Sequence, residues 1–163
     1  MQPVVKLVIV GRDGILNIYR DDHVKSPAEW EPIPGALEAV ARLNHAGWHV
    51  VVATNQAGVG RGMIDMASVN AIHTAMNQHL AAVGGRVDAV FFCPHTPEDQ
   101  CECRKPLPGL MHEIGRRYGI DLDDAMRMFL GATLYDIVVG DNAPRPDYLA
   151  QLLDIFIRGI SRS

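Results

Sequence analysis

Three continuous apolar runs divide the first part of the chain. Residues 4–10, 48–54 and 87–93 are almost entirely apolar, and each run is followed by glycine, asparagine or proline. Short apolar runs bounded by turn residues predict strands that are buried on both faces.

Between these runs, apolar residues recur at a spacing of three and four, which predicts helices. The first carries Leu37, Val40 and Leu43 on one face and stops at Gly47; the second covers residues 69–83; the third starts near Pro108. Strands that alternate with helices predict an α/β fold, with a Rossmann-like parallel sheet and right-handed crossovers.

The last forty residues have a different pattern. Residues 125–147 contain two candidate strands, one ending at Gly131 and one at Gly140. A helical stripe follows, which predicts a helix docked on the sheet or on another subunit: Leu149, Leu152, Leu153, Phe156 and Ile160. We expect one domain over residues 1–163, with 135–163 as an atypical C-terminal tail.

Composition and charge exclude several function classes. The chain has 163 residues, a net charge of −4 and a pI of about 5.9, which argues against a nucleic-acid partner. Its apolar runs are too short to cross a membrane. The N-terminal stretch "MQPVVKLVIVGRDG" lacks the cleavage site of a signal peptide, so we expect a cytoplasmic protein. The default expectation for its oligomeric state is a monomer.

All three cysteines lie within eleven residues, together with one histidine. The stretch "CPHTPEDQCEC" supplies Cys93, His95, Cys101 and Cys103. Three thiolates and one imidazole are the ligand set of a closed tetrahedral zinc site. Because no coordination position is left open, the sequence predicts a structural Zn²⁺ ion that stiffens a polar loop.

Polar residues follow the predicted strands where ligands of parallel sheets bind. Asp13 follows the first strand, and Arg104 and Lys105 precede the third helix. The second strand runs into Thr54, Asn55 and Gln56, followed by Gly58, Gly60 and Gly62. A hydroxyl, amides, exposed backbone N–H groups and two cations predict a phosphate site.

The remaining histidines do not cluster in the sequence. His73 and His79 on the second helix are interpreted as facing solvent, and His112 as a packing or surface residue.

Three motifs together resemble those of the D,D-heptose 1,7-bisphosphate phosphatase family: "RDGILN", "ATNQAGVGRG" and "CPH" followed by "CECRKPLPG". This family belongs to the haloacid dehalogenase superfamily and is related to the histidinol-phosphate phosphatases. The resemblance implies a capless Rossmann-like fold with a zinc-stapled loop. It also implies a magnesium-dependent phosphatase that removes the 7-phosphate of a heptose bisphosphate, for lipopolysaccharide core synthesis.

The resemblance also implies roles for individual residues. An aspartate at position 11 would be the nucleophile, and Asp13 the general acid and base. Thr54, Asn55 and Lys105, with Gln56 beside them, would hold the phosphoryl oxygens, and Arg104 would contact the sugar phosphate. A Gly-Asp pair at the fourth strand would complete a Mg²⁺ site, for which Asp13, Asp136 and Asp141 are candidates.

This chain departs from the family pattern at position 11, which is Gly11. The fourth-strand motif has two alternatives: spacing favours Gly131–Ala132, and local sequence favours Gly140–Asp141. Loss of a nucleophile predicts very low hydrolytic activity. Three hypotheses remain open: a phosphatase completed by Asp141, an impaired relative that binds a phosphorylated sugar, and a zinc-stapled domain with a vestigial site.

Overall fold

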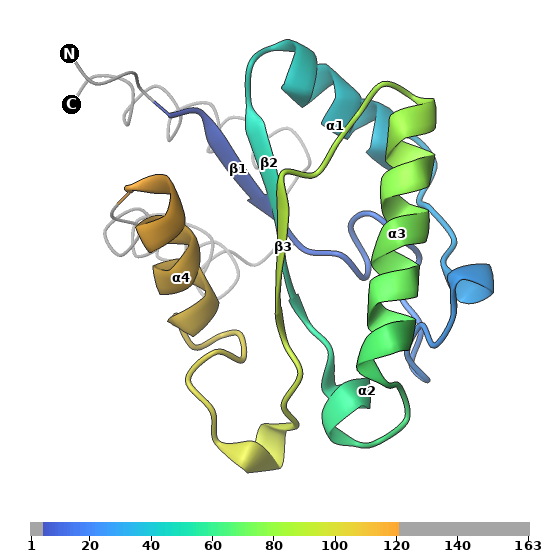
Figure 1. Ribbon diagram of the computed structural model, residues 1–163, viewed down its shortest axis with the longest axis vertical. Coiled ribbons are helices and arrows are strands. Elements are labelled where there is room, and N and C mark those ends of the chain that lie inside the picture. The colour runs from blue at the N-terminus through green and yellow to red at the C-terminus, as the bar shows by residue number, and fades with distance from the viewer. Residues whose placement is uncertain (1–4, 121–163) are drawn as a thin grey trace, which may run out of the picture. The chain divides into compact units, whose positions relative to one another are not determined.

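A computed structural model describes residues 5–120 of the chain, of which Val5–Ile114 form one compact unit (Figure 1). Its strands are β1 (Leu7–Val10), β2 (His49–Asn55) and β3 (Ala89–Cys93). Its helices are α1 (Ala36–His45), α2 (Ala57–Gly60), α3 (Met66–Ala82) and α4 (Gly109–Tyr118), with the short 3₁₀ turns η1 (Pro27–Glu29) and η2 (Pro97–Asp99).

The three strands form a parallel sheet in the order β1-β2-β3, as the apolar runs predict. β2 is the central strand, and Val50, Val51 and Val52 are fully buried. β2 starts one residue and β3 two residues later than the corresponding apolar run, because the first residues of these runs still belong to the incoming loop. The predicted α/β class is confirmed.

Helices α1 and α3 lie on one side of the sheet, and α4 starts on the other (Figure 1). The core between α1, α3 and β2 is apolar; its members include Leu37, Val40, Ile72, Met76 and Leu80. The α3 helix begins at a capping residue, Asp65, whose carboxylate accepts the backbone N–H of Ser68. The helix boundaries follow the predicted periodicity within a few residues.

The strand register brings three segments to one edge of the sheet. β2 extends past its pairing with β1, and Asn55 pairs with Cys93 at the end of β3. Asp13, which lies three residues after β1, therefore faces the same edge as Thr54 and Cys93. This edge positions the candidate site.

None of the helices within residues 5–120 combines the length and apolar character needed to cross a membrane. The predictions for the C-terminal part, including the alternatives Gly131–Ala132 and Gly140–Asp141 and the apolar stripe from Leu149 to Ile160, fall outside the described residues.

Candidate functional site

Gly11 occupies a position where the backbone does not require a glycine. Its φ angle is outside the left-handed region, which six other glycines of the described residues adopt. A Cβ at this position would lie 3.3 Å from Cγ1 of Ile15 and 3.9 Å from Nζ of Lys105. A side chain at position 11 would therefore enter the site beside a lysine ammonium.

The Asp13 carboxylate is held by a ring of donors. Oδ1 accepts from Nε (3.1 Å) and Nη2 (3.0 Å) of Arg12 and from Nδ2 of Asn17 (3.0 Å). Oδ2 accepts from Nη2 of Arg12 (3.2 Å) and from Nε2 of Gln56 (2.8 Å). Asp13 remains partly exposed, whereas the Arg12 side chain behind it is fully buried. Charge-assisted bonds from several directions fix one orientation of the carboxylate.

Thr54, at the end of β2, is buried, and its hydroxyl accepts from Nε2 of Gln56 at 2.9 Å. The structure thus brings Asp13, Thr54 and Gln56 into one hydrogen-bonded group, although 43 residues separate Asp13 from Gln56. The hydroxyl hydrogen of Thr54 stays available for another acceptor, such as a phosphoryl oxygen.

Asn55 and Lys105 are joined through two mutual hydrogen bonds. The backbone N–H of Lys105 donates to Oδ1 of Asn55 (3.0 Å), and Nδ2 of Asn55 donates to the carbonyl of Lys105 (3.1 Å). The Lys105 ammonium donates to the Ala53 carbonyl at 2.7 Å. Burial lowers the pKa of Lys105. The Asn55 side chain therefore fixes the backbone of Lys105, and the Lys105 ammonium lies at the ends of the strands.

Contrary to the prediction from the sequence, the glycine-rich segment after β2 does not present all of its backbone N–H groups as free donors. It forms the short helix α2, and two of its N–H groups already have partners: Gly60 donates to Pro94 (2.8 Å) and Gly62 to Val59 (2.9 Å). A Cβ on Gly60 would approach the Pro94 carbonyl to 2.8 Å. Gly60 packs closely against the loop after β3, and the Gly62 N–H group closes a local turn at a left-handed φ angle, so the expected phosphate cradle of exposed N–H groups is wrong for Gly60 and Gly62.

Arg104 points toward the cysteine-containing loop. Its Nη1 donates to the His95 carbonyl at 3.3 Å. Its neighbour Lys105 enters the strand-end site, so the two adjacent cations contact different parts of the molecule.

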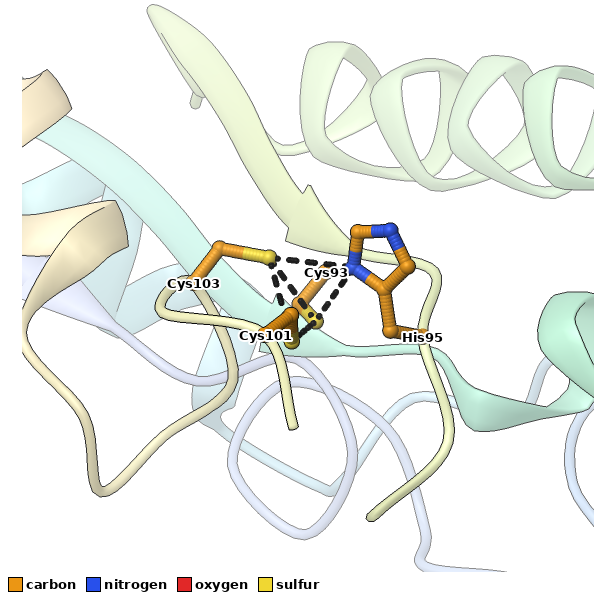
Figure 2. Close-up of side chains that lie close together, drawn as sticks. All are labelled: Cys93, His95, Cys101 and Cys103. Carbon is orange, nitrogen blue, oxygen red and sulfur yellow. Dashed lines mark hydrogen bonds between the residues drawn. The ribbon is translucent and has the colours of Figure 1, made fainter. Parts of the chain in front are cut away.

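The predicted metal ligands converge in one cluster, which Figure 2 shows. Sγ of Cys93 lies 3.1 Å from Sγ of Cys103 and 3.5 Å from Sγ of Cys101. Nδ1 of His95 lies 3.2 Å from Sγ of Cys103. All four ligand atoms lie within 4.8 Å of one another. Zn–S bonds of about 2.3 Å in a tetrahedron give sulfur separations of about 3.8 Å, so small shifts would accommodate zinc.

Burial, and after it the hydrogen bond with the Cys103 thiol, raise the pKa of the Cys93 thiol to about 12. A thiol in such surroundings ionises near neutral pH when a bound cation compensates its charge. A Cβ on Gly109, the first residue of α4, would approach the Glu102 carbonyl to 2.5 Å. Glycine at this position lets α4 start directly against the cluster loop.

Asp13 is the one candidate magnesium ligand that lies within the described residues. Within residues 5–120, the Cys93 cluster is the one group of three or more Cys, His, Asp or Glu side chains whose ligand atoms converge. Asp13 contributes one carboxylate, whose oxygens already accept from Arg12, Asn17 and Gln56. The other candidates, Asp136 and Asp141, lie outside the described residues.

Two residues of this site were missed in the sequence. Arg12 is buried and contacts His73, whose Nε2 lies 3.2 Å from Nη1 of Arg12. The interpretation of His73 as solvent-facing is therefore wrong. The spacing does contain a signal, because residue 73 lies four after Val69 and three before Met76, both fully buried. His79 and His112 are exposed, as expected.

Comparisons with known proteins all find similarity to phosphatases. A family profile described as "Polynucleotide kinase 3 phosphatase" matches residues 15–156, a match that begins two residues after Asp13. The D-glycero-β-D-manno-heptose-1,7-bisphosphate 7-phosphatase of Bordetella bronchiseptica is 49% identical over 147 residues, which are 90% of this chain and 81% of that protein. The protein of the same name from Pseudomonas aeruginosa is 46% identical, over 80% of this chain and 72% of its own length.

A solved structure gives the same result. The crystal structure of D,D-heptose 1,7-bisphosphate phosphatase from B. bronchiseptica, complexed with magnesium and phosphate, superposes with a TM-score of 0.71 at 56% identity. The match covers 72% of this chain and 66% of that one.

Proposed function

The chain belongs to the family of the D,D-heptose 1,7-bisphosphate phosphatases, and from this we propose that it binds a phosphorylated sugar but hydrolyses phosphomonoesters very slowly. The observation that carries the proposal is the geometry at position 11. A side chain there would face Lys105, yet Gly11 offers no group that could attack phosphorus.

The binding groups around this position support retention of the phosphate. The Thr54 hydroxyl has its hydrogen available, and the Lys105 ammonium, which donates to the Ala53 carbonyl, has further N–H groups for a phosphate. Without a carboxylate at position 11, a phosphate dianion meets less repulsion, so its ground-state affinity rises. Arg104, on the cluster side, is proposed to contact the second phosphate of the sugar.

Asp13 remains able to exchange a proton with the sugar oxygen, because its carboxylate is partly exposed. It does not replace the missing nucleophile, since both of its oxygens are held by Arg12, Asn17 and Gln56. The site therefore binds and orients a phosphate ester without the group that would form a covalent intermediate.

The Gly11→Asp variant tests this proposal. The backbone at position 11 accepts any L-residue, and Ile15 needs to move by only a few tenths of an ångström. We expect phosphate release from D-glycero-D-manno-heptose 1,7-bisphosphate with magnesium to rise by about 10⁴-fold or more over the parent chain. Gly11→Asn is the matched control, because it fills the same space without a nucleophilic oxygen.

Two results would contradict the proposal. Turnover by the parent chain above about 1 s⁻¹ would mean that another group performs the attack. Equal, negligible turnover by both variants would mean that position 11 is not the position of the nucleophile in this chain. Titration calorimetry of the parent with inorganic phosphate and with the sugar phosphate tests binding separately.

We propose in addition that the cluster of Cys93, His95, Cys101 and Cys103 holds one structural zinc ion. The converging donor set supports this, because three sulfurs and one imidazole are typical ligands of closed zinc sites. A cytoplasmic monomer without a nucleic-acid partner, organised as one domain over residues 1–163, remains our proposal; the net charge of −4 supports the lack of a nucleic-acid partner.

A further inference from the structure

A fully buried arginine lies directly behind the site. The Arg12 side chain has no exposed surface, and its ion-pair partner is Asp13 at 3.0 Å. Replacing such a buried ion pair by apolar residues is often neutral or stabilising, so the pair is weak evidence for stability. The geometry of the arginine points to another role, because its side chain joins Asp13 and Gln56 of the strand-end site to His73 of α3.

Arg12 determines how the Gln56 amide is oriented. An arginine donates hydrogen bonds and accepts none, and Nη2 of Arg12 lies 2.9 Å from Oε1 of Gln56. The Nε2 group of Gln56 must then face the other way, where it donates to Asp13 (2.8 Å) and to the Thr54 hydroxyl (2.9 Å). Arg12 thus fixes Asp13 directly, and it fixes Thr54 through Gln56.

His73 in turn fixes Arg12. Its Nε2 lies 3.2 Å from Nη1 of Arg12, and since the guanidinium donates, Nε2 accepts and the ring proton sits on Nδ1. The ring packs edge-on against Phe92 of β3, with centroids 6.0 Å apart. Burial, and then the charge of Arg12, lower the pKa of His73 to about 4, so the imidazole is neutral near pH 7.

We propose that His73 is a positioning residue, which acts through Arg12 and Gln56 to orient the Asp13 carboxylate and the Thr54 hydroxyl toward a bound phosphate ester. This inference deepens the proposed function and rests on it for the roles of Asp13 and Thr54. A neutral acceptor is needed at position 73, because an apolar side chain leaves one guanidinium N–H group of Arg12 unpaired in the protein interior.

The test compares His73→Leu, which removes the acceptor, with His73→Gln, which keeps one. The control is Gln78→Leu, a change at an exposed position of the same helix. In the Gly11→Asp protein, with the heptose bisphosphate as substrate, we expect His73→Leu to lower kcat by about 10- to 100-fold while KM stays within about twofold. His73→Gln should restore kcat to within about threefold of the Gly11→Asp protein.

A second readout uses the parent chain and needs no turnover. In ¹⁵N spectra, His73 should carry its proton on Nδ1, and the ¹³Cγ signal of Asp13 should shift in His73→Leu and return in His73→Gln. If Gly11→Asp protein shows no turnover, the proposed function fails, and these spectra still decide the inference about His73.

Three results would overturn the inference. The first is a proton on Nε2 of His73, which would exclude an acceptor role and is measurable even if His73→Leu does not fold. The second is a folded His73→Leu protein with unchanged kcat and an unchanged Asp13 signal. The third is a loss in Gln78→Leu equal to that in His73→Leu, which would indicate a general effect of changing α3.

Discussion

The metal cluster and the strand-end site lie next to each other but are built differently. The cluster takes all four ligands from one stretch of eleven residues, and the predicted set is complete. The strand-end site combines Asp13 after β1, Thr54 and Asn55 at the end of β2, and Lys105 after the cluster, and it has a glycine where the family resemblance implies a nucleophile. The difference teaches that a ligand set within one short stretch depends on local sequence, whereas the strand-end site depends on three segments that the fold brings together.

The largest effect should come from removing the metal. Structural zinc contributes apparent free energies on the order of 10 kcal/mol in small zinc domains, so we expect a strong chelator or Cys93→Ser to lower the melting temperature by more than about 10 °C. Circular dichroism measures the transition, and elemental analysis should find about one zinc per chain.

The control is Glu98→Ala, an exposed position of the same loop that should leave metal content unchanged. If protein purified without chelator contains no metal and melts at the same temperature as chelated protein, the cluster is not a zinc site. The cluster would then no longer be an example of a complete site beside the incomplete strand-end site.

The second effect concerns phosphate binding by the incomplete site. Lys105→Met removes the ammonium but keeps the backbone bonds between Lys105 and Asn55. A hydrogen bond to a charged group contributes about 1.5–3 kcal/mol, so we expect phosphate affinity to fall by roughly 10- to 100-fold. Titration calorimetry with inorganic phosphate measures this affinity, and Lys6→Met is the control at an exposed lysine. Equal phosphate affinities of Lys105→Met and the parent chain would mean that phosphate does not bind at Lys105.

The sequence predicts the parts of this molecule that depend on local patterns. The three strands, three helices and four cluster ligands were predicted because each leaves a period or a short spacing in the chain. The link from Arg12 to His73 spans 61 residues and leaves no such local spacing. The partner of the Gly60 N–H group was missed for a related reason, since the Pro94 carbonyl belongs to the loop after β3 and the contact is tertiary.

A third effect should appear in the pH dependence of stability. The pKa of His73 is about 4 in the folded chain, below its ordinary value of 6.5, because burial and Arg12 disfavour the charged ring. The unfolded chain binds this proton first as pH falls, so the contribution of His73 is complete above about pH 6.5 and is lost as pH falls toward about 4.

Urea unfolding at several pH values measures this loss, which we expect to be about 2 kcal/mol larger in the parent chain than in His73→Gln. The difference between the two proteins isolates His73, because protonation of the metal ligands affects both. Parallel stability curves would indicate that the ring is accessible to water and that Arg12 lacks this partner.

The smallest effect concerns the space at position 11. A Cβ there would lie 3.3 Å from Cγ1 of Ile15, which is tighter than ordinary contact. Ile15 is about half exposed, so Ile15→Val alone should change the free energy of unfolding by less than about 0.5 kcal/mol. Ile15→Ala removes Cγ1. We expect its effect on the free energy of unfolding to be about 0.5 kcal/mol more favourable in the Gly11→Asp protein than in the parent chain.

A double-mutant cycle over Gly11→Asp and Ile15→Ala measures that coupling. Strict additivity would mean that Ile15 moves aside without cost, so that position 11 accepts an aspartate freely. A coupling of the expected sign would mean that Cγ1 of Ile15 lies in space that a side chain at position 11 needs. The backbone at position 11 fits an aspartate in either case, because its φ angle lies outside the left-handed region.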